Sequence, residues 1–280
     1  MPRHFTHYYF SQNLVEDASY AISAIVGLYP DAFLLGSLGA DLFAEKAHKE
    51  RLKDADPIQL FGVTAHHIFK NGSKCQLSYM LGFTAHFALE RAAAPFVSFF
   101  EKNGVNGYFG GANERKNARE IEIGIDRHIV RDYLGMKKAL TLVDDFKVRK
   151  EVYEEIADLY VDVINDVADL YLNRHKTLLI LESVKADFPL AEGLGRIDYM
   201  NRENREWIAY TGEKTALSFD ELLKEQTPVA YELLVEYMKM ARSNQQPNEA
   251  LFALSAEEGE KAGEKDLPTE ETPLSDGEEY

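Results

Sequence analysis

Apolar residues recur at spacings of three and four along most of the chain, which is the period of a helix with one buried face. They are not accompanied by any convincing run of alternating apolar and polar residues, so the pattern predicts an all-α protein. The helices that we expect cover residues 4–15, 18–28, 57–69, 73–95, 113–134, 150–172, 176–185 and 218–241.

Helix-capping signals support these boundaries. Asp56 precedes Pro57, the pattern of an N-cap followed by proline at the first helical position. Ser218 and Glu221 have the spacing of a capping box. Pro95 lacks a backbone N–H and clashes with the preceding turn, so it is predicted to kink or end its helix. The glycine-rich segment 103–111 is predicted to be a loop.

Charge divides the 280 residues into two parts. Residues 257–280 hold ten acidic and two basic residues, and this difference of eight is half of the formal net charge of −16. We therefore predict one helical domain over residues 1–242 and an acidic, disordered tail over 243–280. The domain itself is only mildly acidic, which argues against a basic surface for nucleic acid and against docking on anionic lipid.

The sequence favours a cytoplasmic location. Cys75 is the only cysteine, so an intrachain disulfide is excluded. No uninterrupted apolar run typical of a signal peptide precedes Glu16 and Asp17. The most apolar span, residues 20–43, is interrupted by a proline and two aspartates, and it fits buried core helices better than a transmembrane helix.

His86 and Glu90 are the first indication of chemistry. They stand at positions i and i+4 of a predicted helix, so one face presents an imidazole and a carboxylate to the same ion. The next position on that face, Ala94, offers no ligand atom. Six of the eight histidines lie within the first 86 residues, which concentrates possible metal ligands in this part of the chain.

Several short motifs accompany this pair between residues 1 and 130. They are Met1-Pro2 with Thr6-His7-Tyr8, Gly39-Ala40-Asp41, Gly62 four residues before His66, Gly82-Phe-Thr-Ala-His86-Phe-Ala-Leu-Glu90, and Ala118 followed by Glu122 and Asp126. Together they resemble the motifs of the zinc-dependent phospholipase C family, which is related to the single-strand-specific fungal nucleases. The resemblance implies a multi-helix bundle of that fold.

The resemblance also implies a cluster of metal ligands. Family members bind three zinc ions that activate water and neutralise a phosphodiester. Carried onto this chain, one zinc site would use His7 with a shared Glu90. A second would use Asp41, His66 and His86 together with the same Glu90.

The third zinc site is incomplete. Ala94 and Ala118 stand where the family has histidines, which leaves only Glu122. A catalytic zinc usually takes three protein ligands, so this site should be empty and the resemblance implies one or two zinc ions. Glu122 and Asp126 are also consistent with a structural role, in which they pair with neighbouring arginines on a solvated face.

Two functions remain open from the sequence. The first is a metal-dependent phosphodiesterase in which Asp41 orients or deprotonates the attacking water; its substrate would be a phospholipid, a nucleotide or another phosphodiester. The second is a non-catalytic scaffold of the same fold, which the two missing histidines favour. A third helical class, the His-Asp metal phosphohydrolases, is disfavoured because no His-Asp dipeptide occurs.

Overall fold

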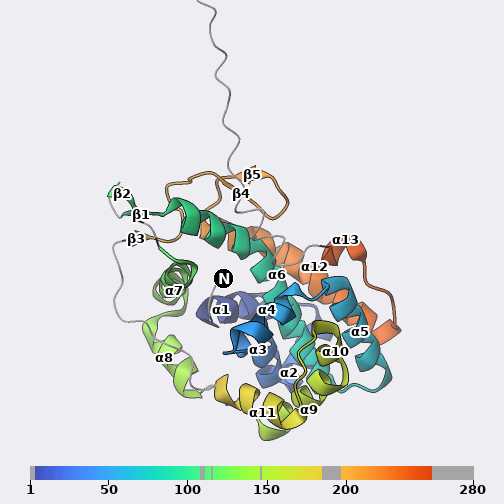
Figure 1. Ribbon diagram of the computed structural model, residues 1–280. Helices are drawn as coiled ribbons and strands as arrows, with labels where there is room; N and C mark the ends of the chain where they lie inside the picture. Colours follow the sequence, from blue (N-terminus) through green and yellow to red (C-terminus); the bar gives the residue numbers. More distant parts are fainter. Residues whose placement is uncertain (1–3, 108–110, 115, 146, 185–196, 254–280) are drawn as a thin grey trace, which may run out of the picture.

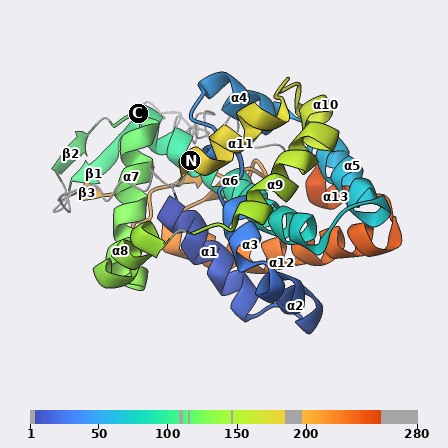
Figure 2. The same cartoon turned by 90° about the horizontal axis from the view of Figure 1, so that it is seen from below.

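The longest described helix, α6 (Lys74–Asn103), runs through the middle of the molecule (Figure 1). It packs most extensively against α3 (Pro30–Ser37) and α12 (Phe219–Ser243), and α1 (His4–Glu16) also lies along it. Most side chains of α6 are buried, so this helix forms the centre of the core. Figure 2 shows the same arrangement from below, with α1 and α3 beside each other.

The computed structural model describes residues 4–107, 111–114, 116–145, 147–184 and 197–253. These residues are mainly helical, which confirms the predicted all-α class. The remaining helices are α2 (Tyr20–Leu28), α4 (Lys46–Asp54), α5 (Pro57–Lys70), α7 (Ala118–Ile129), α8 (Met136–Asp145), α9 (Lys150–Leu159), α10 (Asn165–Ala168), α11 (Arg174–Ser183) and α13 (Glu249–Phe252). One 3-10 helix, η1 (Gly39–Leu42), and two π-helical turns, η2 (Val130–Leu134) and η3 (Tyr160–Ile164), join them.

The predicted capping residues begin their helices as expected. The carboxylate of Asp56 accepts hydrogen bonds from the backbone N–H groups of Ile58 and Gln59 at the start of α5. Ser218 and Glu221 form the predicted capping box of α12. Local side-chain hydrogen bonds therefore fix where these helices enter the bundle.

Pro95 was predicted to kink or end its helix. The predicted end is wrong, because α6 continues through this proline to Asn103. The proline forfeits one backbone hydrogen bond. Its neighbours Ala94 and Phe96 are both buried, so tertiary packing holds the helix together on either side. Helix propensity is a weak determinant in such a buried segment.

Short strands replace part of the predicted loop 103–111 and the start of the predicted helix 113–134; residues 108–110 of that loop lie outside the described residues. β1 (Val105–Gly107) pairs in antiparallel fashion with β2 (Gly111–Glu114) and with β3 (Ile197–Asp198). β4 (Trp207–Ile208) and β5 (Lys214–Thr215) form a second small antiparallel pair. In Figure 1, β1, β2 and β3 lie at the left edge of the bundle, and β4 and β5 lie above α6.

The domain extends beyond the predicted boundary at residue 242. After α12 ends, the chain returns through α13, whose Phe252 is fully buried with its ring centroid 4.8 Å from that of Phe61. The guanidinium of Arg91 donates a hydrogen bond to the carbonyl oxygen of Leu251 at 2.7 Å. Residues 244–253 are therefore part of the helical domain. The rest of the predicted tail, residues 254–280, lies outside the described residues.

Within the described ranges, no individual helix combines the length and apolar character needed to cross a membrane. α2 and α3 meet that test only when taken together, and they are bent by 98° relative to one another.

Candidate metal centre

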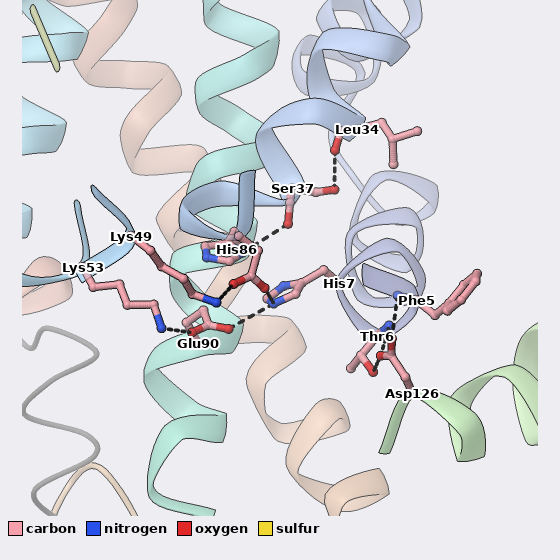
Figure 3. Close-up of polar contacts among 11 residues, drawn as sticks. Phe5, Thr6, His7, Leu34, Ser37, Lys49, Lys53, His86, Glu90 and Asp126 are labelled. Atoms are coloured by element: carbon pink, nitrogen blue, oxygen red, sulfur yellow. Dashed lines mark hydrogen bonds and ion pairs between the residues drawn. The ribbon is translucent and has the colours of Figure 1, made fainter. Parts of the chain in front are cut away.

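Side chains from three elements meet beside the middle of α6 (Figure 3). His86 and Glu90 lie one turn apart on α6, His7 comes from α1, and Asp41 comes from η1. His7 Nε2 lies 3.0 Å from Glu90 Oε1 and 4.0 Å from Asp41 Oδ2. The rings of His7 and His86 stack with their centroids 4.3 Å apart. Four of the six predicted ligands, from distant parts of the sequence, are therefore brought together.

Glycine residues allow α3 and α6 to approach closely enough to build this site. A Cβ atom on Gly36 would overlap the backbone of Tyr79, and one on Gly82 would overlap the backbone of Phe33. Side chains at either position would push the two helices apart. This close packing brings the end of α3 and the following η1 against His86.

The backbone of Ser37 orients the imidazole of His86. The His86 Nδ1 lies 3.2 Å from the carbonyl oxygen of Ser37. Because a carbonyl oxygen only accepts, Nδ1 carries the proton and Nε2 keeps a lone pair. Metal-binding histidines are commonly held in this way through their second nitrogen. Burial, assisted by the neighbouring His7, lowers the pKa of His86 to about 3, so the ring is neutral.

His7 is positioned through the start of α1. Asp126 of α7 accepts hydrogen bonds from the backbone N–H groups of Phe5 at 3.2 Å and Thr6 at 2.9 Å, and from the Thr6 hydroxyl. These bonds satisfy free N–H groups in the first turn of α1. Burial raises the pKa of Asp126, against the effect of its hydrogen bonds from Thr6. Asp126 therefore has a structural role, but the predicted solvated face is wrong for this residue, because its carboxylate is buried and binds the first turn of α1.

Two lysines that the sequence reasoning did not single out also reach the site. Lys49 and Lys53 lie one turn apart on α4 and extend toward the carboxylates (Figure 3). The Lys49 ammonium forms an ion pair with Asp41, and Lys53 Nζ lies 3.9 Å from Glu90 Oε2. The sequence of α4 is highly charged, which is typical of a surface helix. Only the i, i+4 spacing of Lys49 and Lys53 indicates that they share one face of it.

These contacts keep both carboxylates ionised. Burial alone would raise the pKa of Asp41, but the positive charge of Lys49 holds it well below its ordinary value. Burial likewise opposes ionisation of Glu90, whereas the hydrogen bond with His7 and the charge of Lys53 lower its pKa to about 2. The Lys49 pKa is raised, because attraction to Asp41 outweighs the effect of burial.

His7, His86 and Glu90 fit the donor set of a divalent transition metal. One ligand atom from each lies within 4.8 Å of the other two, and all three residues are buried. Around one zinc ion with bonds of about 2.0–2.2 Å, neighbouring ligand atoms would be about 3.4 Å apart, so modest side-chain adjustment suffices. Glu90 Oε2 is buried with no hydrogen-bond partner among the described residues, and the Lys53 ammonium stays 3.9 Å from it, beyond hydrogen-bond distance.

His66 does not join this group, which corrects the ligand set implied by the resemblance. The core face of α5 is formed by Phe61, Ala65 and Ile68, and His66 falls beside that stripe on the exposed side. Its Nδ1 lies 2.6 Å from Asn244 Oδ1 after α12. There it lines an open groove of about 410 Å³ formed by Gln59, Val63, His66, His67, Lys70, Asn71, Asp162, Val163, Asp166 and Val167.

The remaining predicted positions lie around the cluster without completing a third site. Ala94 is buried on α6 one turn beyond Glu90, and Ala118 begins α7. Glu122 is partly exposed on α7, and its negative charge acts on Lys49. Among the described residues, Glu122 is not part of the group that could hold an ion.

Comparison with known proteins adds no further assignment. No family model matches this chain, and no significant match is found among curated proteins or solved structures. The family resemblance therefore rests on the short motifs alone.

Proposed function

We propose that this protein is a metal-dependent phosphodiester hydrolase with a single divalent ion, preferably zinc, bound by His7, His86 and Glu90. The observation that carries this proposal is the meeting of two imidazoles and an ionised carboxylate in one buried group. Two histidines with one glutamate form the protein ligands of several catalytic zinc sites, in which the fourth position is left for water or substrate.

The orientation of the ligands supports the same proposal. His86 presents Nε2 because Nδ1 is engaged by Ser37, and Glu90 remains ionised despite its burial. A bound divalent ion supplies a Lewis acid that polarises a phosphoryl oxygen and lowers the pKa of a coordinated water. The residues of the chain would hold the reactants in place and exclude bulk water.

Asp41 is suited to orienting the attacking water through a hydrogen bond. Its Oδ2 lies 4.0 Å from His7 Nε2, beside the ligand group. Because its pKa is held well below the ordinary value, it stays ionised and is a weak proton acceptor at neutral pH. Of the two roles that the sequence left open for Asp41, the electrostatics favour orientation over deprotonation.

The direct test is hydrolysis of bis(p-nitrophenyl) phosphate by metal-free protein to which zinc or manganese is added back. We expect metal-dependent turnover that His86→Ala abolishes and Asp41→Asn reduces. His66→Ala should retain activity, because His66 lies in the separate groove. Turnover that is indifferent to His86→Ala, or that His66→Ala abolishes, would contradict the proposed ligand set.

The second candidate function is a helical scaffold without catalysis, and the lysine pairing favours it. Lys49 and Lys53 place positive charge beside Asp41 and Glu90, so the carboxylates have cationic neighbours even when no metal ion is bound. Ala94 and Ala118 remove two further ligands from the pattern that the resemblance implies. A chain that binds zinc in stoichiometric amount but hydrolyses none of a panel of phosphodiesters would support this scaffold.

A further inference from the structure

The two lysines of α4 occupy the outer boundary of the metal cluster. The side chains of Lys49 and Lys53 are 32% and 16% exposed, whereas those of His7, Glu90 and Asp41 are 0%, 3% and 8% exposed. An anion that approaches the buried ligands from this side therefore meets two ammonium groups first. The ammonium of Lys49 has three N–H donors, more than its ion pair with Asp41 uses.

Both carboxylates of the cluster already face an ammonium group before an ion binds. Asp41 forms an ion pair with Lys49, and Glu90 Oε2 lies 3.9 Å from Lys53 Nζ. Glu122 adds a negative charge that acts on Lys49 from a more exposed position, where water screens it. A divalent ion would thus bring an excess of positive charge into a buried region, where unpaired charge is unfavourable.

We propose that Lys49 and Lys53 make metal binding and phosphate binding interdependent: the ion is held more tightly together with a phosphate dianion than alone. This inference rests on the proposed metal site. The dianion supplies the two negative charges that the ion requires, and it accepts hydrogen bonds from ammonium groups that turn away from the carboxylates. The lysines thereby select anionic, phosphate-bearing ligands and disfavour neutral ones.

The coupling must be reciprocal, since two ligands that favour the same state raise each other's affinity by the same factor. Lys49 has the larger role because it contacts Asp41 directly and its own pKa is raised by that contact, so it remains charged. Lys53 stands farther from its partner, Glu90, at 3.9 Å. Removing either ammonium should strengthen binding of the ion alone and weaken its dependence on phosphate.

The experiment is equilibrium dialysis of the full chain against zinc held at buffered, submicromolar free concentration, with and without millimolar inorganic phosphate at pH 8. We expect phosphate to tighten zinc binding by at least about fivefold, within the usual range of coupling between two sites. In Lys49→Met the zinc affinity without phosphate should rise, and the effect of phosphate should fall below about twofold.

Lys46→Met is the matched control, because it removes the same charge from the same helix. Lys46 is 87% exposed and pairs with Glu50 at 3.3 Å, away from the cluster. It should leave the effect of phosphate as in the unaltered chain. Lys53→Met provides a second variant if Lys49→Met fails to fold, and the comparison with and without phosphate needs no variant at all.

The outcomes separate this inference from the function on which it rests. Zinc that binds with the same affinity in both buffers overturns the coupling but leaves the metal site standing. An equal loss of coupling in Lys46→Met and Lys49→Met would mean that the coupling depends on the overall charge of the protein. It would overturn the proposed role of Lys49 and Lys53. Absence of zinc binding in either buffer would overturn the metal site and the coupling together.

Discussion

The imidazole of His86 is tied to the backbone of Ser37, whose carbonyl oxygen lies 3.2 Å from the ring Nδ1. This contact links the end of α3 to the centre of α6 and determines which ring nitrogen faces the cluster. The ring of His7 stacks on that of His86, with the two centroids 4.3 Å apart. The cluster therefore depends on the course of the chain through α3 and η1 as much as on the ligands themselves.

Gly39→Ala should weaken metal binding without altering any ligand. Gly39 has a φ of +49°, and a Cβ atom there would overlap the ring of His86. The ring has to move, which displaces Nε2 from the ligand group. We expect zinc affinity to fall at least about tenfold, as measured by competition with a chromogenic chelator, because small displacements of site residues have large effects.

Gly212→Ala separates this overlap from backbone strain. Gly212 has a φ of +83°, so alanine is strained there too, but no described atom lies within 4 Å of the added Cβ. Each substitution should cost about 1–2 kcal/mol of stability from the left-handed conformation. Only Gly39→Ala should impair zinc binding. Equal zinc affinity in the two variants would show that Gly39 does not position His86.

Acid should destabilise the metal-free protein through His86. The unfolded chain protonates this histidine near its ordinary pKa of about 6.5, whereas the folded protein does so at about 3. Between these values the unfolded state holds the extra proton. The stability conferred by neutral His86 is therefore complete above about pH 6.5 and is lost as the pH falls, at up to about 1.4 kcal/mol per pH unit.

Urea unfolding across this range tests the assignment. In the His86→Gln variant the free energy of unfolding should depend less on pH between about pH 6.5 and 4.5, which is above the range in which carboxylates titrate. The same replacement at exposed His66 serves as the comparison. Parallel curves for the unaltered chain and His86→Gln would mean that His86 is not held neutral by burial.

Phe252→Ala should destabilise the whole domain, although the residue lies in the segment that the sequence assigns to a disordered tail. Its ring is fully buried against Phe61 and Phe87. Truncation of such a phenylalanine costs about 3–5 kcal/mol, whereas Leu179→Ala at a half-exposed position should change stability by about 0.5 kcal/mol or less. Chemical denaturation of both variants checks this. Similar small effects would place the boundary back at residue 242.

Much of the candidate site could be predicted from the sequence, because its central pair is local. His86 and Glu90 share a helix face through their spacing alone. His7 and Asp41 could be added only through the resemblance, since nothing local shows that α1 and η1 meet α6. The same transfer placed His66 wrongly, although the apolar stripe of α5 through Phe61, Ala65 and Ile68 already excludes it.

The lysines and the C-terminal segment show what the sequence could not indicate. Lys49 and Lys53 lie in a highly charged helix, and such residues usually face solvent. Their partners are distant along the chain, so no spacing rule connects them. Phe252 lies in a short apolar run, residues 250–254, within a polar C-terminal segment, and only the tertiary structure shows that it packs against Phe61 and Phe87. At Pro95 the low helix propensity of proline is outweighed by tertiary packing, and α6 continues.

The most direct measurement of the central claim is the metal content of the native chain, purified without chelators, by native mass spectrometry. We predict one equivalent of zinc in the unaltered protein and none in His7→Ala or Glu90→Ala, with His66→Ala keeping its zinc. A protein that carries no stoichiometric metal after incubation with zinc, or one whose zinc survives the loss of His7 and Glu90, would contradict the account.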